Sequence, residues 1–242
     1  MAVQVLELWR YPVKSLQGEQ LDAADVGTVG LTGDRAWGLV DTETGLVLTA
    51  RREPNLLFGA ARIGRDGVEV YDEGGRLLPT DRDMSDWLGR PVELRRAHPS
   101  AGGQFEAPVD DFHEEGQWKQ WEGHVGSFHD SRRTTVSLAS LLSIGEWEAR
   151  RFRANVILDD DGALSPTTED AWVGKELVAG TARLDVRRRI DRCVVVTRAQ
   201  PGLGRNLDVL KSINAESDGC VGVGAWVTSP GRLAVGDDVR PV

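Results

Sequence analysis

The chain has 242 residues, of which 40% are hydrophobic and 28% charged, the composition of a folded globular protein with one large or two small domains. Its net charge of −9 argues against a general nucleic-acid-binding protein, which needs a broad basic surface. No apolar stretch reaches the 18 residues of a membrane span, and residues 1–10 lack the apolar core of a signal peptide. Two distant cysteines fit a reducing compartment. We therefore expect a cytoplasmic protein that binds neither nucleic acid nor membrane.

The first part of the chain has the short strands and turns of a β unit. Turn signals stand at 42–45 and 64–67, where glycine ends a polar run. A short helix is predicted over 83–88, with Asp83 as its N-cap. The expected strands are 3–11, 36–41, 46–50, 57–63, 68–71 and 92–96. These elements predict an N-terminal domain over residues 1–97.

The pattern weakens after this domain, although Trp118 and Trp121 indicate that part of the stretch packs. We place a connecting segment at 98–133 and a second domain at 134–242. Ser137 is predicted to cap an amphipathic helix over 139–150. The expected strands here are 156–158, 177–186, 193–197, 221–227 and 233–239, with a short helix over 206–211. The fold class is thus mainly β (α+β), with a few short helices.

Cys193 is the residue with the clearest chemical potential. It follows Arg192, and further arginines stand at 183 and 187–189. A thiolate is a soft ligand for a transition metal and a nucleophile when positive charge lies nearby. An acidic protein with local basic clusters fits a small anionic ligand better than a polymer. The alternative is a small buried strand residue, since free cysteine is among the most buried residue types.

Several motifs occur in a fixed order along the chain. They are Tyr11-Pro12-Val13-Lys14-Ser15, Gly33-Asp34-Arg35, Arg151-Phe152-Arg153-Ala154-Asn155 and Arg192-Cys193. Together they resemble the MOSC domain proteins, and most of all the mitochondrial amidoxime-reducing component and its bacterial relatives. The resemblance runs from about Val3 to Val242. It implies an N-terminal MOSC-type β-barrel unit and a C-terminal MOSC β-barrel domain, with a molybdenum cofactor bound between them.

The resemblance also implies roles for particular residues. Cys193 is implied to be the single protein ligand of molybdenum and the catalytic residue. The implied cofactor-binding residues are Lys14, Ser15, Arg35, Arg153, Asn155 and Arg192, and Ser137 joins them because a helix N-terminus can hold an anion. If Arg153 and Asn155 lie on a strand, two residues apart, their side chains share one face.

Other interpretations of these residues stay open. From composition alone, Lys14 and Arg35 could be exposed surface charges, and Arg153, if buried, could pair with a carboxylate instead of a phosphate. The four histidines, His98, His113, His124 and His129, lack zinc-site spacing, and we interpret them as surface or loop residues.

The activity implied by the resemblance is the reduction of a small N-hydroxylated (N-oxygenated) substrate, such as an amidoxime, by removal of its oxygen atom. We expect electrons to come from a separate donor protein, a flavin or iron–sulfur/haem reductase, because the chain lacks the four further cysteines of an iron–sulfur domain. Arg198-Ala199-Gln200-Pro201-Gly202 departs from the family's more acidic turn and leaves the substrate open. The alternatives are a molybdenum cofactor or sulfur carrier that uses Cys193, and a metal-free β-rich binding domain.

Overall fold

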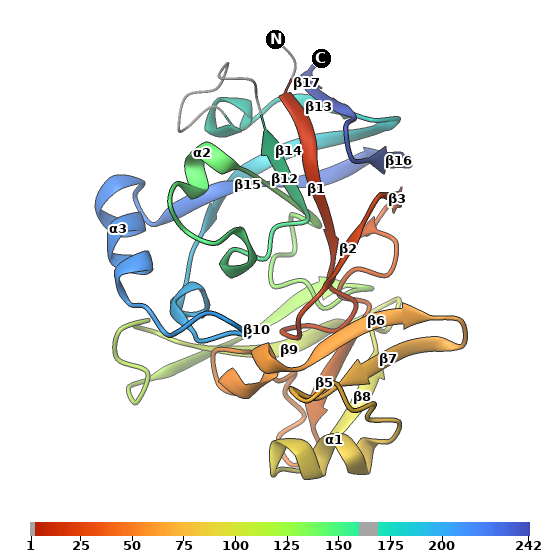
Figure 1. Ribbon diagram of the computed structural model, residues 1–242, viewed down its shortest axis with the longest axis vertical. Helices are drawn as coiled ribbons and strands as arrows, with labels where there is room; N and C mark the ends of the chain where they lie inside the picture. Colours follow the sequence, from red (N-terminus) through yellow and green to blue (C-terminus); the bar gives the residue numbers. More distant parts are fainter. Residues whose placement is uncertain (1–2, 160–168) are drawn as a thin grey trace.

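A closed seven-stranded barrel forms the upper half of the molecule in Figure 1, which presents a computed structural model that describes residues 3–159 and 169–242. Antiparallel pairing of β1 with β12 closes the ring, and β11 and β12 are its one parallel pair among the described strands. Around the ring the strands are β12 (Val156–Asp159), β11 (Val136–Ser140), β15 (Cys220–Ser229), β14 (Ala182–Asp191), β13 (Glu176–Ala179), β17 (Asp238–Pro241) and β1 (Val3–Arg10). A short strand, β2 (Glu19–Leu21), extends the sheet from β1.

The barrel interior is filled by the inward-facing residues of these strands. In β14 the residues from Ala182 to Val186 alternate between the buried interior and the outer face, as a half-buried strand requires. Val5, Leu8, Leu138 and Val223 belong to the same buried cluster. Removing these apolar side chains from water is the main force that holds the ring closed.

The N-terminal unit consists of small two-stranded sheets and two short helices around a second core, which includes Val13, Leu39 and Met84. Its strand pairs are β5 (Trp37–Asp41) with β8 (Val92–Arg96) and β6 (Ala60–Gly64) with β7 (Gly67–Tyr71), and its helices are η1 (Pro54–Phe58) and α1 (Asp81–Leu88). A three-stranded sheet of β3 (Ala23–Gly27), β4 (Gly30–Leu31) and β16 (Gly231–Ala234) packs against the barrel core instead. The mainly β fold class with few helices is confirmed.

Two local predictions in this unit are wrong. Thr80 caps α1, and Asp83 is the third helical residue, whose carboxylate returns the bond in a capping box. The stretch 46–50 is not a continuous strand, although the chain does reverse at 42–45 and pairs antiparallel with β5 at the Val40–Val47 bridge. The longer ladder of β5 is with the distant β8. A turn signal identifies a chain reversal but does not decide how far the pairing continues.

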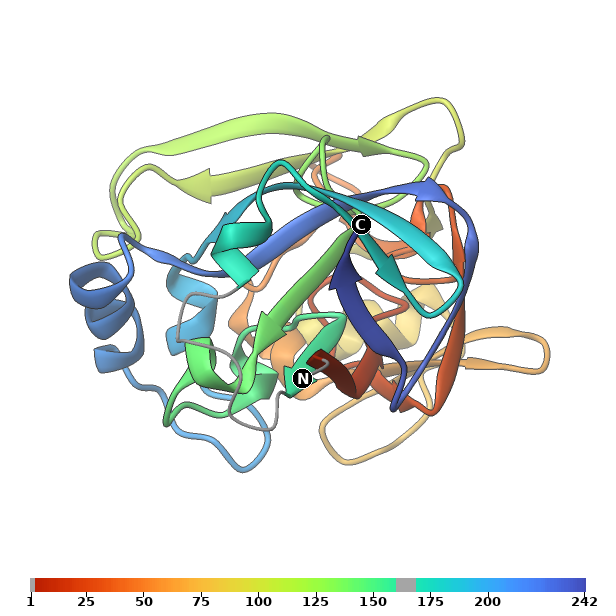
Figure 2. The same cartoon turned by 90° about the horizontal axis from the view of Figure 1, so that it is seen from above.

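A long hairpin occupies the stretch in which the sequence pattern is weak. Its strands are β9 (Gly102–Pro108) and β10 (Trp118–Val125), and Figure 2 shows them lying along one side of the barrel. Phe105 is fully buried and packs against Trp121 at a ring separation of 5.8 Å. The hairpin therefore packs through one face.

The helix predicted over 139–150 is wrong in large part. The chain continues in β11 as far as Ser140, turns through the four-residue α2 (Leu141–Ile144) and makes a 3-10 turn, η2 (Ala149–Arg151). Ser140 caps α2 by accepting a hydrogen bond from the Ser143 N–H, at 3.1 Å. Ser137 lies within β11 and is not a helix cap.

The strand predicted over 193–197 is also wrong, because this segment forms a 3-10 turn, η4 (Val194–Thr197), with Cys193 at its N-cap. Buried Arg151 donates hydrogen bonds to the carbonyls of Val196 and Arg198, at 3.2 and 3.0 Å. These bonds satisfy carbonyls that a strand would pair with a neighbour. Three valines in a row favour a strand locally, and a guanidinium from far along the chain overrides them.

The remaining elements complete the C-terminal half. The stretch predicted as one strand over 177–186 is a hairpin of β13 and β14, which turns at Gly180-Thr181. The last helices are η3 (Glu169–Trp172) and α3 (Asp208–Glu216). In the part of the chain described here, no helix has the length and apolar character needed to cross a membrane.

Gly222 makes a β-bulge in β15 possible. Residues 221 and 222 together oppose one residue of β14, and Gly222 has a φ of +74°. A Cβ atom there would lie 2.5 Å from the Leu138 carbonyl oxygen of the neighbouring strand. The bulge thus requires glycine both for its φ and for its space.

We predict that Gly222→Ala destabilises the barrel by more than the cost of about 1–2 kcal/mol that a left-handed φ alone imposes. Gly45 is the matched control, because its φ is +73° and nothing lies within 4 Å of a Cβ added there. Urea unfolding of both alanine variants measures the difference. Equal losses of unfolding free energy would show that the close approach to Leu138 is unimportant.

Candidate functional site

A cavity of about 480 Å³ lies between the barrel and the N-terminal unit, and its walls come from both. All eight residues singled out in the sequence line it: Lys14, Ser15, Arg35, Ser137, Arg153, Asn155, Arg192 and Cys193. Segments far apart in the chain therefore meet around one space. The role of each residue stays a prediction.

Three of these residues have left-handed backbones. Ser15, Arg35 and Arg153 have φ values of 70°, 48° and 52°, and among the described residues only Asp218 joins them as a non-glycine with positive φ. Such conformations persist only where the surrounding structure imposes them, and they concentrate at functional sites. Arg153 and Asn155 precede β12, so the expectation that they share one face of a strand is wrong.

Tyr11 lies close to two guanidinium groups of the cavity lining. The central carbons of Arg35 and Arg153 each lie 4.4 Å from the centre of its ring. Arg35 donates two hydrogen bonds to the Asp34 carboxylate, at 2.7 and 2.6 Å, and one to the Arg153 carbonyl, at 2.9 Å. Arg153 donates to the Leu16 carbonyl, at 2.7 Å. Arg35 thus has a carboxylate partner.

Arg153 differs from Arg35 in its partners. Its Nη1 is buried and has no hydrogen-bond partner among the described residues. Burial lowers the pKa of Arg153 to about 10, although the nearby Tyr11 hydroxyl opposes this. Thr49 and Thr135, which also line the cavity, have buried hydroxyls without a partner in the described chain. Buried donors of this kind cost free energy unless a ligand satisfies them.

A second cationic group lies around Asp130. Lys14 Nζ is 3.0 Å from the Asp130 carboxylate and Arg51 Nη1 is 3.3 Å from it. Burial lowers the pKa of Lys14 to about 8, against the opposing effect of Asp130. The same two cations hold the pKa of Asp130 well below its usual range, even though burial acts to raise it. A carboxylate of the protein therefore occupies a position suited to an anion.

Arg51 connects this group to Cys193. It lines the same cavity as Cys193, and although burial acts to lower the pKa of Arg51, Asp130 and the neighbouring Cys193 raise it. No role for Arg51 is predicted from the sequence. The available signal is the pair of adjacent arginines in Thr49-Ala50-Arg51-Arg52.

Arg192 lies on the other side of the thiol. Its guanidinium donates to the Val221 carbonyl, at 2.9 and 2.6 Å, and to the Phe152 carbonyl, at 2.8 Å. Burial lowers its pKa to about 10, while the adjacent Cys193 raises it. Arg192 thus secures the segment before η4 and brings a positive charge to the cavity. Cys220 does not line the cavity, and burial raises the pKa of its thiol.

Ser137 and Asn155 bind each other. The Ser137 hydroxyl and N–H both donate to Asn155 Oδ1, at 2.9 and 3.1 Å, and Asn155 Nδ2 donates to the Trp9 carbonyl, at 3.2 Å. These bonds fasten the start of β12 to β11 and β1. The pair supports the cavity wall on which Arg153 stands.

Two of the four histidines are buried, which contradicts their interpretation as surface or loop residues. His124 and His129 are 6% and 9% exposed, whereas His98 and His113 lie on the surface. His129 lines the cavity, and its Nε2 is 3.6 Å from the Asp34 carboxylate. Burial lowers its pKa to about 3, with Asp34 opposing and Arg35 adding to the effect. The ring is therefore neutral at ordinary pH.

The cavity as a whole is cationic. Among the residues that the structure describes, eight lysines and arginines line it (Lys14, Arg35, Arg51, Lys119, Arg151, Arg153, Arg188 and Arg192), against the three carboxylates Asp111, Asp130 and Asp191. One thiol, Cys193, stands on the same walls. This arrangement suits an anionic ligand that also presents a soft metal or an electrophile to sulfur.

A closed β-barrel joined to a smaller β unit, with a thiol in a cationic cavity, defines the class. The MOSC N-terminal beta barrel domain matches residues 2–113 and the MOSC domain matches residues 126–240. The chain belongs to the MOSC family, which confirms the resemblance noted in the sequence. The boundaries placed at 97 and 134 remain a prediction.

Individual relatives are similar over different lengths. The human molybdenum cofactor sulfurase is 23% identical over 98% of this chain, and the bovine sulfurase is 21% identical over the same share. The chain spans about a third of the length of these two proteins (32%). Bovine mitochondrial amidoxime reducing component 2 is 46% identical over 58 residues, which are 22% of this chain and 17% of that protein. The solved structure of the YuaD protein of Bacillus subtilis aligns with 99% of this chain and 94% of its own, at 14% identity and a TM-score of 0.44.

His129 makes a testable contribution to acid stability. Its pKa is about 3 in the folded protein and 6.5 in its unperturbed state, so between these values the unfolded chain binds more protons than the folded chain. We predict that this residue alone lowers the free energy of unfolding by about 1.4 kcal/mol for each pH unit below 6.5, down to about pH 3.

The measurement is urea unfolding at a series of pH values for wild type, His129→Gln and the surface control His98→Gln. His129→Gln should have the shallower slope, and His98→Gln should keep the slope of the wild type. Equal slopes for wild type and His129→Gln would contradict the burial of a neutral ring.

Proposed function

We propose that this protein is a molybdenum-cofactor-binding oxidoreductase that reduces N-hydroxylated substrates by removing their oxygen atom. One observation carries the proposal: the single thiol of the cavity lies beside Arg51 and among cations from both halves of the chain. The family match and the similarity to a protein named as an amidoxime reducing component support it.

The donors around the cavity fit such a cofactor. Arg153, whose Nη1 has no partner in the described part of the chain, and Arg35 would hold the terminal phosphate, with Lys14 and Ser15 beside them. Ser15 Oγ accepts a hydrogen bond from the Ala50 N–H, at 3.0 Å, and this leaves its proton free to donate. Cys193 would be the protein ligand of the metal. When bound, the cofactor supplies the oxygen-atom chemistry and the exchange of electrons.

The protein's own residues orient and enclose the reacting groups. The positive charges of Arg51 and Arg192 would offset the negative charge of a coordinated sulfur. Arg151 anchors the 3-10 turn that follows Cys193 through two backbone carbonyls and so supports the segment that carries the thiol. In the overall reaction the N–O bond breaks, and the oxygen leaves as water with two protons and two electrons from a separate donor protein. That donor and the cytoplasmic location remain predictions.

A cofactor or sulfur carrier is the second candidate. It is favoured by the length of the similarity to proteins named as molybdenum cofactor sulfurases, which extends over 98% of the chain. A carrier binds the same ligand but releases it to an acceptor without turnover. Reduction of benzamidoxime with a chemically reduced dye, measured on protein loaded with cofactor, separates the two. Turnover supports the reductase, and metal binding without turnover supports the carrier.

Cys193→Ser should remove both bound molybdenum and amidoxime reduction, because a hydroxyl is a harder and poorer ligand than a thiolate. Cys220→Ala is the matched control, since Cys220 is outside the cavity and burial keeps its thiol protonated. It should keep both properties. Metal analysis and turnover are measured side by side. If Cys220→Ala loses the metal as fully as Cys193→Ser, a site with a single thiolate is wrong.

Arg153→Ala and Lys14→Ala should each lower the molybdenum retained per chain after desalting by about tenfold or more, because each removes a charge-assisted hydrogen bond. Arg82→Ala serves as the control, since its side chain is 90% exposed on α1. Its retention should equal that of the wild type. Full retention in both cavity variants would contradict a role for these cations in phosphate binding.

A further inference from the structure

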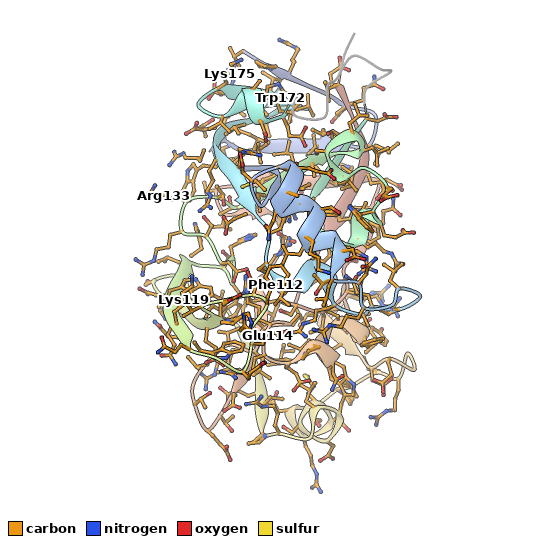
Figure 3. All side chains as sticks on the ribbon, turned by 90° about the vertical axis from the view of Figure 1, so that its left-hand side faces the viewer. Phe112, Glu114, Lys119, Arg133, Trp172 and Lys175 are labelled. Carbon is orange, nitrogen blue, oxygen red and sulfur yellow. The ribbon has the colours of Figure 1, made fainter. Side chains whose placement is uncertain are left out.

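The loop between β9 and β10, residues 109–117, is fastened over the segment that carries Cys193. Asp111 Oδ1 accepts a hydrogen bond from the N–H of Val194, the residue after the thiol, at 3.1 Å. Glu114 forms an ion pair with Arg198 and lies 3.8 Å from Arg205. Phe112 and Glu114, labelled in Figure 3, lie where this loop passes in front of the C-terminal segments. These tethers hold the loop at the thiol side of the cavity.

Two residues of this loop, Val109 and Asp111, line the cavity and differ in polarity. Val109 is 59% exposed, and Pro108 lies beside it, so this part of the wall is apolar. Asp111 follows two residues later and also lines the cavity. The wall next to Cys193 thus combines an apolar surface with a carboxylate.

Asp111 differs from the other two carboxylates of the cavity. Asp130 is paired with Lys14 and Arg51, and Asp191 is paired with Arg188. Asp111 has no ion-pair partner within residues 3–159 and 169–242. A carboxylate has two oxygens and about four acceptor positions, and one bond to Val194 leaves most of them available. In a cavity lined mainly by cations, the Asp111 carboxylate is therefore the group that can accept a ligand's hydrogen-bond donor or positive charge.

We propose that Asp111 selects substrates that carry an N–H group next to their N–O bond, and that Val109 contacts the apolar part of the same substrate. This inference rests on the proposed function and specifies its substrate class. In an amidoxime the amino group is on the carbon that is bonded to the nitrogen of the N–O bond. The amidine that forms on reduction is a cation. Asp111 accepts the amino hydrogens, while the N–O oxygen points toward the Cys193 side. A tertiary amine N-oxide has no such hydrogen and makes no use of Asp111.

Asp111→Asn is the decisive variant because the asparagine carbonyl still accepts the Val194 N–H, so the tether stays while the charge is lost. Asp110→Asn is the matched control, because Asp110 is next to it in the chain and bonds the exposed His113, at 2.7 Å. Binding of benzamidine and of uncharged benzamide to the cofactor-loaded protein is measured by calorimetry. Turnover of benzamidoxime and of an aromatic N-oxide is measured on the same preparations, after molybdenum per chain is shown to be equal.

We expect Asp111→Asn to weaken benzamidine binding about tenfold, the effect of one charge-assisted hydrogen bond at a partly exposed wall, and to raise KM for benzamidoxime by a similar factor. Benzamide binding, kcat and turnover of the N-oxide should not change, and Asp110→Asn should behave as wild type. Val109→Ser should weaken the binding of both aromatic ligands.

Unchanged benzamidine affinity in Asp111→Asn overturns the proposal, as does an equal loss of turnover for both substrates, which would mark Asp111 as a tether only. Failure of the wild type to bind benzamidine overturns it as well. Binding of benzamidine that depends on Asp111, in a protein that reduces neither substrate, would leave this amidinium site standing while the proposed reductase function fails.

Discussion

The pairing of β1 with β12 is the constraint on which the site depends. It closes the barrel, and it also brings together the two chain segments that leave these strands at the same end. Trp9 and Asn155 exchange hydrogen bonds across the pair, and Arg153 reaches the Leu16 carbonyl just beyond it. Lys14 and Ser15 thereby come to face Arg153 across one cavity. Without this closure, the basic residues of the two halves would be unrelated surface charges.

A cluster of buried cations is unfavourable by itself, and the fold compensates for it locally. Arg151 and Arg192 are satisfied by backbone carbonyls, Arg35 by Asp34, and Lys14 and Arg51 by Asp130. Among the described residues Arg153 Nη1 has no partner, and it lies beside backbones held at left-handed φ values. Stored strain and unmet hydrogen-bonding capacity at the same place are what a site prepared for an anionic ligand requires.

Different parts of the cavity wall come from different kinds of structure. Arg35 and Arg153, both close to the Tyr11 ring, stand at strand ends and tight turns of the barrel and the N-terminal unit. The β9–β10 loop is tethered near Cys193 by Asp111 and Glu114 and is not part of the barrel. In many proteins the scaffold positions the groups that bind a cofactor, while loops carry the groups that select a substrate. Sequence change in such a loop alters recognition with little effect on the fold.

The sequence by itself determined the fold class, the alternating strands such as β1, the β6–β7 hairpin at its glycine turn, and the set of residues that gather at the cavity. These depend on local periodicity and on motifs. Only the tertiary structure decided that β5 pairs with β8, that His129 is buried, and that Arg51 lines the same cavity as Cys193. The 3-10 turn after Cys193 has the same origin, because Arg151 satisfies its carbonyls from 45 residues away. Contacts between distant segments leave no periodicity in the chain, and so they appear only when the barrel closes.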